Sequence, residues 1–421
     1  MKWRWPLVAA PIALLIGLVG LYHYTVPMYD EWAMVPFFQK HALGQLRLSD
    51  FWQQHVDHRM FFPQLIIYEL GRVTRWNIGY EVVVSLVIAV ATFALLVHII
   101  DVHFTTPLER ALASVAASAI LFSPLAWENW LWGWQISAFL PSFGLMLAVA
   151  SFTGMRRVHR GLRFAFAVIG AVVASYSLGQ GLLVWPVCLP VLVLDRSWRR
   201  WVPAWTALAA VVVVAYAIGY VRNVSSNGVA NYGWAFARYW QTFLARPLSY
   251  QGTATGATSL VLVAAVAIAV AGVRRSATSL HAIMPWLVLG MYALSAAALT
   301  ASGRTELGRA QADASRYTTM SGLLVVALVM LLIRSYTAAT PRPLRVASAG
   351  AVIVIAALVA MNYADGARQM ERNYSENMVV ARRCLGTATS ASDPCLYATH
   401  PEPAAIWPFV QFLRTHNLAG L

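Results

Sequence analysis

The feature that most constrains this chain is a repeated pattern of apolar runs about 20 residues long, separated by polar stretches. A hydrocarbon layer about 30 Å thick requires a helix of roughly that length. Charged residues make up 11% of the chain, against about 25% in soluble proteins. The sequence therefore predicts an all-α, polytopic transmembrane helical bundle and excludes an ordinary water-soluble enzyme.

Reading the apolar runs against their polar flanks predicts eleven spans. They cover residues 6–27, 81–100, 110–126, 135–152, 164–178, 180–194, 202–221, 256–273, 282–301, 317–334 and 346–363. The first run begins as a signal peptide would, but residues 21–24 offer no small-residue cleavage site, so we expect it to be retained. Residues 1–363 then form the transmembrane module, and residues 364–421 form a short cap outside it.

Charge predicts the orientation of the bundle. Short loops rich in arginine all fall on one side, namely 155–160, 195–200, 274–275 and 342–345. With Lys2 and Arg4, that side holds 15 Lys and Arg against 3 Asp and Glu, whereas the other side holds 16 against 14. The positive-inside rule makes the basic side cytoplasmic. The net charge of +14 therefore serves membrane insertion and contact with anionic lipid, and a nucleic-acid partner loses its main support.

An odd number of spans, with the N-terminus in the cytoplasm, places the C-terminal segment outside. Cys384 and Cys395 both lie there, where an oxidising compartment permits a disulfide, although two free thiols remain the alternative. The chain is rich in Ala and Arg and contains only two lysines, Lys2 and Lys40. This composition indicates a GC-rich bacterial genome, so the expected location is the bacterial cytoplasmic (inner) membrane.

Polar residues concentrate in long segments on the predicted outer side, which are 28–80, 222–255, 302–316 and 364–421. Within 28–80, apolar spacing predicts two short interfacial helices, near 32–37 and 61–70. Asp30 and Glu31 directly follow the first span. The two carboxylates suit a general base or a metal ligand, or they cap and complement the dipole of the helix that begins near Trp32.

Two outer clusters contain basic residues. If their segment is helical, His55, His58 and Arg59 share one face, and they suit either phosphate binding by Arg59 with His58 or, less well, a zinc site. The second cluster precedes the tenth span and includes Arg304, Arg316 and Tyr317. It suits either a lipid phosphate or an interfacial anchor.

A third outer cluster, residues 127–135, interleaves four tryptophans with polar side chains. It matches an aromatic belt at the membrane interface, or a surface that stacks on a sugar ring and bonds its hydroxyls. The candidate sugar-binding or acceptor-binding residues are Glu128, Asn129, Trp132 and Gln135, together with Gln180 in a glycine-flanked turn.

These residues together resemble the GT-C superfamily of integral-membrane glycosyltransferases, over spans one to ten. The shared features are an acid directly after the first span, a long outer first loop with two interfacial helices, and an apolar body of many spans. More narrowly, the short motifs resemble those of uncharacterised bacterial glycosyltransferase-like proteins. They are 30–32, 58–59 with 62–63, 127–129 with 133–135, 179–181 and 315–317.

The resemblance implies inverting transfer of a sugar from a polyprenyl-phosphate carrier to a lipid-linked or cell-envelope glycan acceptor. It makes Asp30 the base, with Glu31 as second choice. Donor phosphate then falls to the basic clusters, that is, to Arg59, His58, Arg304, Arg316 and Tyr317. Arginine alone can handle a monophosphate leaving group, so we expect no cofactor and no obligatory metal, although the adjacent acids leave a divalent ion open.

Two other functions fit a protein with many spans. A lipid-linked polysaccharide polymerase or ligase shares the donor class, but it places its working loop late in the chain. A lipid or glycan transporter (flippase) should show broken helices and ionisable groups near the midplane. Here the charges sit at span ends and the acids precede the second span, which favours the transferase.

Overall fold

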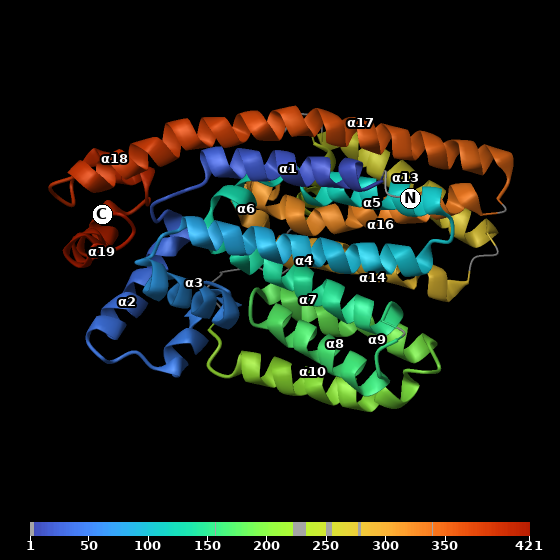
Figure 1. Cartoon of the computed structure of the whole chain (residues 1–421), viewed down its shortest axis with the longest axis horizontal. Coiled ribbons are helices and arrows are strands. Elements are labelled where there is room, and N and C mark those ends of the chain that lie inside the picture. Colours follow the sequence, from blue (N-terminus) through green and yellow to red (C-terminus); the bar gives the residue numbers. More distant parts are fainter. Residues whose placement is uncertain (1–3, 156, 222–232, 250–254, 277–278, 339) are drawn as a thin grey trace.

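The computed structural model describes residues 4–155, 157–221, 233–249, 255–276, 279–338 and 340–421. Lys2, residue 156 of a basic loop and parts of segment 222–255 therefore lie outside the described residues. Long apolar helices run side by side along the molecule (Figure 1). They are α1 (Arg4–Tyr22), α4 (Gly79–His103), α5 (Pro107–Leu121), α7 (Ile136–Thr153), α8 (Arg160–Ser175), α9 (Val184–Leu194), α10 (Val202–Ala217), α13 (Thr255–Arg275), α14 (Leu280–Arg304), α16 (Thr318–Thr337) and α17 (Arg342–Asn373).

Each predicted span coincides with one of these helices. Within the described residues, nine helical segments are long and apolar enough to cross a membrane. This confirms an all-α protein with many membrane helices. Helices α8 and α9 are not among these nine segments, so the count of eleven spans stays a prediction.

Helices α7 and α16 form the centre of the bundle. Both are buried along almost their whole length, whereas α1, α10 and α17 expose most of their side chains on the outside. Figure 1 shows α17 and α10 on opposite flanks. Helices α7 and α8 cross closely, because a Cβ on Gly144 would lie only 2.2 Å from the carbonyl oxygen of Gly170. Small residues allow such close backbone approach inside membranes, where packing drives association.

The first loop folds over one end of the bundle as short elements. They are η1 (Tyr29–Met34), α2 (Val35–Ala42), η2 (Leu48–Trp52), β1 (Gln54–His55), β2 (His58–Arg59) and α3 (Phe61–Thr74). Helices α2 and α3 lie where apolar spacing predicted helices. Residues 54–59, however, form an antiparallel hairpin and no helix, so the shared helical face of His55, His58 and Arg59 does not exist. Instead His55 pairs with His58, and alternation along a strand turns Arg59 to the opposite face.

Further short elements connect the long helices. They are η3 (Pro124–Ala126), α6 (Trp127–Leu131), η4 (Gly133–Gln135), η5 (Gly179–Leu183), η6 (Arg199–Trp201), α12 (Trp234–Ala245), η7 (Arg246–Leu248), η8 (Thr305–Leu307), α15 (Gly308–Ala312) and η9 (Ser315–Tyr317). Most of them consist of a single turn, which lets the chain change direction while its backbone groups stay hydrogen-bonded.

The C-terminal segment continues the last long helix. Helix α17 runs through the expected boundary at residue 363 into the π-helical turn η10 (Tyr374–Met378) and α18 (Val379–Thr387), followed by η11 (Pro394–Ala398) and α19 (Pro403–His416). Figure 1 shows this segment at the same end as α2 and α3. The backbone N–H of Tyr29 donates to the carbonyl of Thr399 (2.9 Å), and that of Ala419 donates to Arg75 (3.0 Å). The C-terminal segment is therefore joined directly to the first loop.

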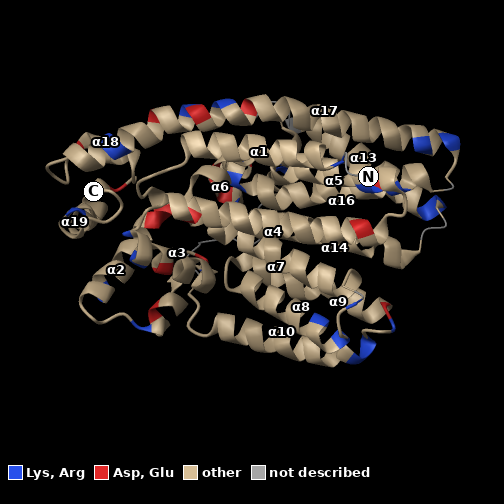
Figure 2. Cartoon of the chain, in the orientation of Figure 1, with Lys and Arg blue, Asp and Glu red and all other residues tan. Residues whose placement is uncertain are grey.

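The two ends of the bundle differ in charge. Figure 2 shows arginines gathered at the end opposite α2 and α3, and most acidic side chains toward the end that carries the first loop and the C-terminal segment. This asymmetry matches the division into basic and acidic sides made from the sequence. The acidic end also holds the candidate site.

Candidate functional site

A cavity of about 390 Å³ lies at the acidic end of the bundle. Its walls come from η1, the hairpin, segment 127–135, the turn near Gln180, the end of α14 and η9. Nine of the residues that the sequence assigned to catalysis, phosphate binding or sugar binding line it: Asp30, His58, Glu128, Trp132, Gln135, Gln180, Arg304, Arg316 and Tyr317. The fold therefore collects into one space residues that are far apart in the chain.

Asp30 presents a carboxylate to this cavity. Its side chain is 53% exposed, and one oxygen lies 3.9 Å from Nε2 of His55. Tyr29, directly before it, has a φ of 50°, which is unfavourable for an aromatic residue and costs about 1–3 kcal/mol. The hydrogen bond to Thr399 and an edge-on contact with Trp132 (ring centroids 5.7 Å apart) hold Tyr29 there. The position of Asp30 is thus fixed by packing around its neighbour.

Glu31 lies on the other side of η1, outside the residues that line the cavity. It is fully buried, and its carboxylate accepts hydrogen bonds from the backbone N–H groups of Met28 and Trp134, both at 3.0 Å. Burial raises the pKa of Glu31 to about 8. A Cβ on Gly133 would lie 2.4 Å from a carboxylate oxygen of Glu81 and 3.1 Å from one of Glu31. Glu31 therefore joins η1 to segment 127–135, while Asp30 faces the ligand space.

The two hairpin histidines line the cavity as neutral side chains. Burial, and then the nearby Arg304, lower the pKa of His58 to about 3, and burial also lowers the pKa of His55. The backbone N–H of Gly179 donates to Nδ1 of His58 (3.3 Å). Within the described residues, Nε2 of His55 has no hydrogen-bond partner. The His55 ring therefore keeps hydrogen-bonding capacity for a ligand.

Glu128 and Asn129 join α6 to η9. One Glu128 oxygen accepts from the Ser315 hydroxyl (2.7 Å) and the Arg316 backbone N–H (2.9 Å), and the other accepts from the Arg316 guanidinium (3.1 Å). The Asn129 amide donates to the Arg316 carbonyl (2.8 Å) and the Thr319 hydroxyl (2.6 Å). Asn129 lies outside the residues that line the cavity. Glu128 thus orients Arg316, and Asn129 supports the turn that carries it.

Arg304 makes fewer interactions within the protein than Arg59 or Arg316. Its guanidinium donates to the hydroxyl of Tyr317 (3.0 Å), and the hydroxyl of Tyr239 lies 3.4 Å from that same oxygen. In the described part of the chain, no carboxylate lies within 4.0 Å of Arg304. Because the half-buried guanidinium of Arg304 lines the cavity and has no carboxylate partner among the described residues, it is available to bind an anion there.

Arg59 lies outside the cavity and serves the fold. Its guanidinium donates to the carbonyls of Tyr216 (2.6 Å), Trp52 (2.6 Å) and Ile218. Two of these carbonyls lie at the C-terminal end of α10, where backbone oxygens lack helical partners and attract a cation. All of the nitrogens of this buried side chain are thereby used to dock the hairpin. Of the residues assigned to phosphate, the structure groups the other four around the cavity.

Some lining residues were not selected from the sequence. Tyr24, Tyr29 and Asn373 are among them. His55 and Trp134 also line the cavity, and both belong to outer clusters that the sequence had already indicated. His55 stood beside His58 in the sequence, and strand pairing places the two opposite one another. Asn373 carried no local signal, because its position depends on the continuation of α17 beyond the membrane.

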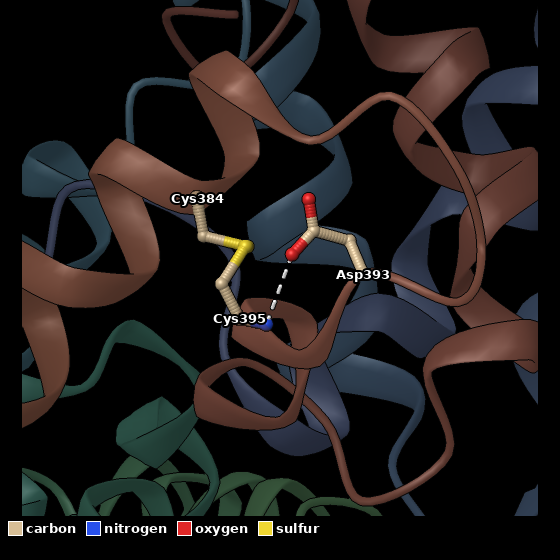
Figure 3. Close-up of side chains that lie close together, drawn as sticks. All are labelled: Cys384, Asp393 and Cys395. Atoms are coloured by element: carbon tan, nitrogen blue, oxygen red, sulfur yellow. Dashed lines mark hydrogen bonds between the residues drawn. A yellow bond between two sulfur atoms is a disulfide. The ribbon is translucent and has the colours of Figure 1, made fainter.

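One group of side chains resembles a metal site. Within the described residues, only Cys384, Asp393 and Cys395 bring three potential ligand atoms within 4.8 Å of one another. Figure 3 shows that the two sulfurs form a disulfide and that a carboxylate oxygen of Asp393 accepts from the Cys395 N–H. The two Cα atoms lie 5.6 Å apart, and the hydrogen bond is 3.1 Å long. Zinc binds thiolates, which a disulfide does not provide. This group therefore anchors the C-terminal segment.

The arrangement at the cavity can bind an anionic ligand that also has apolar ring faces and hydroxyls. The arginines attract the anion, the indoles offer faces for stacking, and the Asp30 carboxylate can accept a proton. No family model, no curated protein and no solved structure matches this chain.

Proposed function

We propose that this protein is an inverting glycosyltransferase, which moves a sugar from a polyprenyl-phosphate carrier to a lipid-linked or cell-envelope glycan acceptor. The observation that carries the proposal is the single cavity that contains Asp30, Arg304 and Arg316 at one end of a bundle of membrane helices. A lipid-linked phosphate reaches such a site from the bilayer, while the polar acceptor enters from water.

The proposed reaction uses Asp30 as general base. As the acceptor oxygen attacks the anomeric carbon, its proton passes to the Asp30 carboxylate. The bond between that carbon and the phosphate oxygen breaks, and the electron pair leaves with the phosphate. Arg304, Arg316 and the Tyr317 hydroxyl offset the charge that develops on the leaving group. Because Asp30 is half exposed, it returns the proton to water.

Other lining residues suit the binding of sugar hydroxyls and ring faces. Trp132, Gln135 and Gln180 line the same cavity as Asp30. A neutral His58 contributes a hydrogen bond without competing with the arginines for the phosphate. Since cations alone neutralise a monophosphate, the proposal requires no metal cofactor.

We place the N-terminus in the cytoplasm and the site at the outer face of a bacterial cytoplasmic membrane. The arginine-rich end opposite the cavity supports this orientation under the positive-inside rule. The Cys384–Cys395 disulfide, at the cavity end, suits an oxidising compartment. Labelling of single added cysteines with an impermeant reagent, in loops at each end, tests it.

The experiment that tests the function is transfer of radiolabelled sugar from a panel of polyprenyl-phosphate sugars in membranes that contain the protein. Asp30→Asn should lower the rate by about 100-fold or more, the range for loss of a general base. Glu69→Gln is the matched control, because Glu69 is an exposed acid of the same loop, paired with Arg72 outside the cavity. A parallel reaction with chelator should proceed at the same rate.

Three outcomes contradict the proposal. Equal activity of Asp30→Asn and wild type would remove Asp30 as base. A requirement for added divalent ion would overturn the metal-independent mechanism. If no donor supports sugar transfer, in a preparation that still binds the short polyprenyl phosphate farnesyl phosphate, the result would favour a transporter or a polymerase.

A further inference from the structure

A second cavity of about 260 Å³ adjoins the first. His58, Gln180 and Arg304 line both spaces and therefore form a shared wall. The second cavity extends from this wall toward the ends of α10 and α14, where Asp57, Tyr216 and Tyr220 face it. A ligand whose anion sits at Arg304 thus reaches both cavities at once.

Two residues that line the second cavity each have a hydrogen-bond acceptor without a partner. Within the described residues, one carboxylate oxygen of Asp57 and the amide oxygen of Gln180 are buried and accept no hydrogen bond. The Gln180 amide nitrogen is already occupied, because it donates to the Thr300 hydroxyl (3.0 Å). Buried acceptors without donors are costly unless a ligand or water supplies the donor. The oxygens of Asp57 and Gln180 therefore require hydrogen-bond donors, such as the hydroxyl groups of a ligand.

The remaining walls suit a sugar ring. The rings of Tyr216 and Tyr220 lie 5.9 Å apart, and their hydroxyls contact the carbonyl of Asp57 at 3.4 and 3.3 Å. Ring faces of this kind pack against the C–H groups of a pyranose while its hydroxyls bond elsewhere. Gly179 allows the His58 ring to pack closely at this wall, since a Cβ there would lie 3.0 Å from Nδ1 of His58.

The charges are ordered across the shared wall. Arg304 attracts an anion at the junction, whereas Asp57 adds a negative charge farther into the second cavity. An anionic group placed beside Asp57 would be repelled, and such repulsion is an effective source of specificity. A neutral ring with hydroxyls, or a ring with an amine, would instead satisfy the free acceptors.

We propose that the second cavity binds the sugar of the donor and that Asp57 and Gln180 select neutral or amino sugars against uronic acids, with the donor phosphate at Arg304. The proposal rests on the glycosyltransferase function for the identity of the donor, but it concerns binding and can be measured without transfer.

The test compares the affinity of the purified, full-length protein for farnesyl phosphate with its affinity for farnesyl-phosphate sugars. The panel contains neutral hexoses and a pentose, an amino sugar and a uronic acid. At least one neutral or amino-sugar conjugate should bind about tenfold more tightly than farnesyl phosphate, and the uronic acid conjugate should gain nothing. Asp57→Ala and Gln180→Ala should each weaken binding of that conjugate by about tenfold and so remove the gain, because each substitution deletes a charged or buried hydrogen bond. Both should leave farnesyl phosphate affinity unchanged.

Two further variants guard against misfolding as an explanation. Arg304→Gln should lower the affinity for every ligand in the panel, including farnesyl phosphate. Asp57→Asn keeps the shape and an acceptor but removes the charge, so it should newly admit the uronic acid conjugate, a gain that a damaged protein cannot mimic. Glu69→Gln should match wild type throughout.

The proposal is overturned if wild type binds the uronic acid conjugate as tightly as the neutral ones, if no sugar increases affinity, or if the Asp57 and Gln180 variants keep the gain. Its failure is distinct from failure of the transferase function. Transfer that does not depend on Asp57 and Gln180 refutes only the sugar site, whereas a dependent gain in affinity without any transfer refutes only the reaction.

Discussion

Removal of the Cys384–Cys395 disulfide should loosen the backbone that positions Asp30. The bridge joins α18 to η11, and Thr399, the residue after η11, accepts the hydrogen bond from the Tyr29 N–H. Tyr29 is held at a φ of 50° and would relax if that contact opened. The double variant Cys384→Ser/Cys395→Ser therefore reports whether the C-terminal segment fixes the site.

The size of the effect follows from the loop that the bridge closes. With a sequence separation of 11 residues, the lost loop-closure entropy amounts to about 3 kcal/mol at 25 °C. Loss of the bridge lowers the free energy needed to open the C-terminal segment locally by this amount, and it leaves the stability of the apolar bundle unchanged. Since 1.4 kcal/mol corresponds to a factor of ten, the opened state becomes up to about 100-fold more populated.

Hydrogen exchange followed by mass spectrometry measures this directly in lipid nanodiscs. The Tyr29 amide should exchange up to about 100-fold faster in the serine variant and in wild type treated with reductant. The Trp198 amide, which donates to Asp195 (2.9 Å) at the opposite end of the bundle, is the internal control. Unchanged exchange at Tyr29 would refute the coupling between the bridge and the site. Equal acceleration at Trp198 would show that the bridge supports the whole bundle instead.

Three other predictions concern the framework of the site. Burial raises the pKa of Glu31 from 4.5 to about 8. The contribution of the protonated side chain to the stability of the fold is therefore fully present below pH 4.5 and is lost as the pH rises toward 8. Across that interval the melting temperature should fall less steeply for Glu31→Gln than for wild type. Gly144→Leu forces a side chain against the carbonyl of Gly170, 2.2 Å from a Cβ, and should cost about 1–3 kcal/mol or more. Its control is Gly290→Ala, where the nearest atom to a Cβ is 3.8 Å away, and equal melting temperatures would contradict the close crossing of α7 and α8. Arg59→Lys replaces a planar group that serves three carbonyls, and the hairpin amides should exchange faster while those of α7 do not.

Features that depend only on local stretches of the chain could be predicted from the sequence. Apolar runs predicted where the long helices lie, because a hydrocarbon layer accepts little else than a helix of that length. Apolar spacing likewise located α2 and α3. The uneven distribution of arginine distinguished the two ends of the bundle, since each loop contributes its charge regardless of how the helices pack.

The assignment of roles within the site was not accessible in this way. Asp30 and Glu31 are adjacent and chemically alike, yet a hydrogen bond from Trp134, 103 residues away, fixes Glu31 inside the protein while Asp30 faces the cavity. Arg59 and Arg304 are the same residue type, and only the fold decides that each guanidinium nitrogen of Arg59 donates to a backbone carbonyl, at Trp52 or at the end of α10. Local spacing contains no information on such distant partners.

The sequence by itself thus determined a membrane protein of many helices, its two unlike ends, and the residue types with which one end could perform chemistry. Tertiary structure alone decided that residues 54–59 form a hairpin, that α17 continues into the C-terminal segment, and that a second cavity lies behind Arg304. The physical reason is that membrane insertion responds to the average polarity of a segment. The charge, exposure and hydrogen-bonding capacity of a single side chain depend instead on the atoms that the fold places around it.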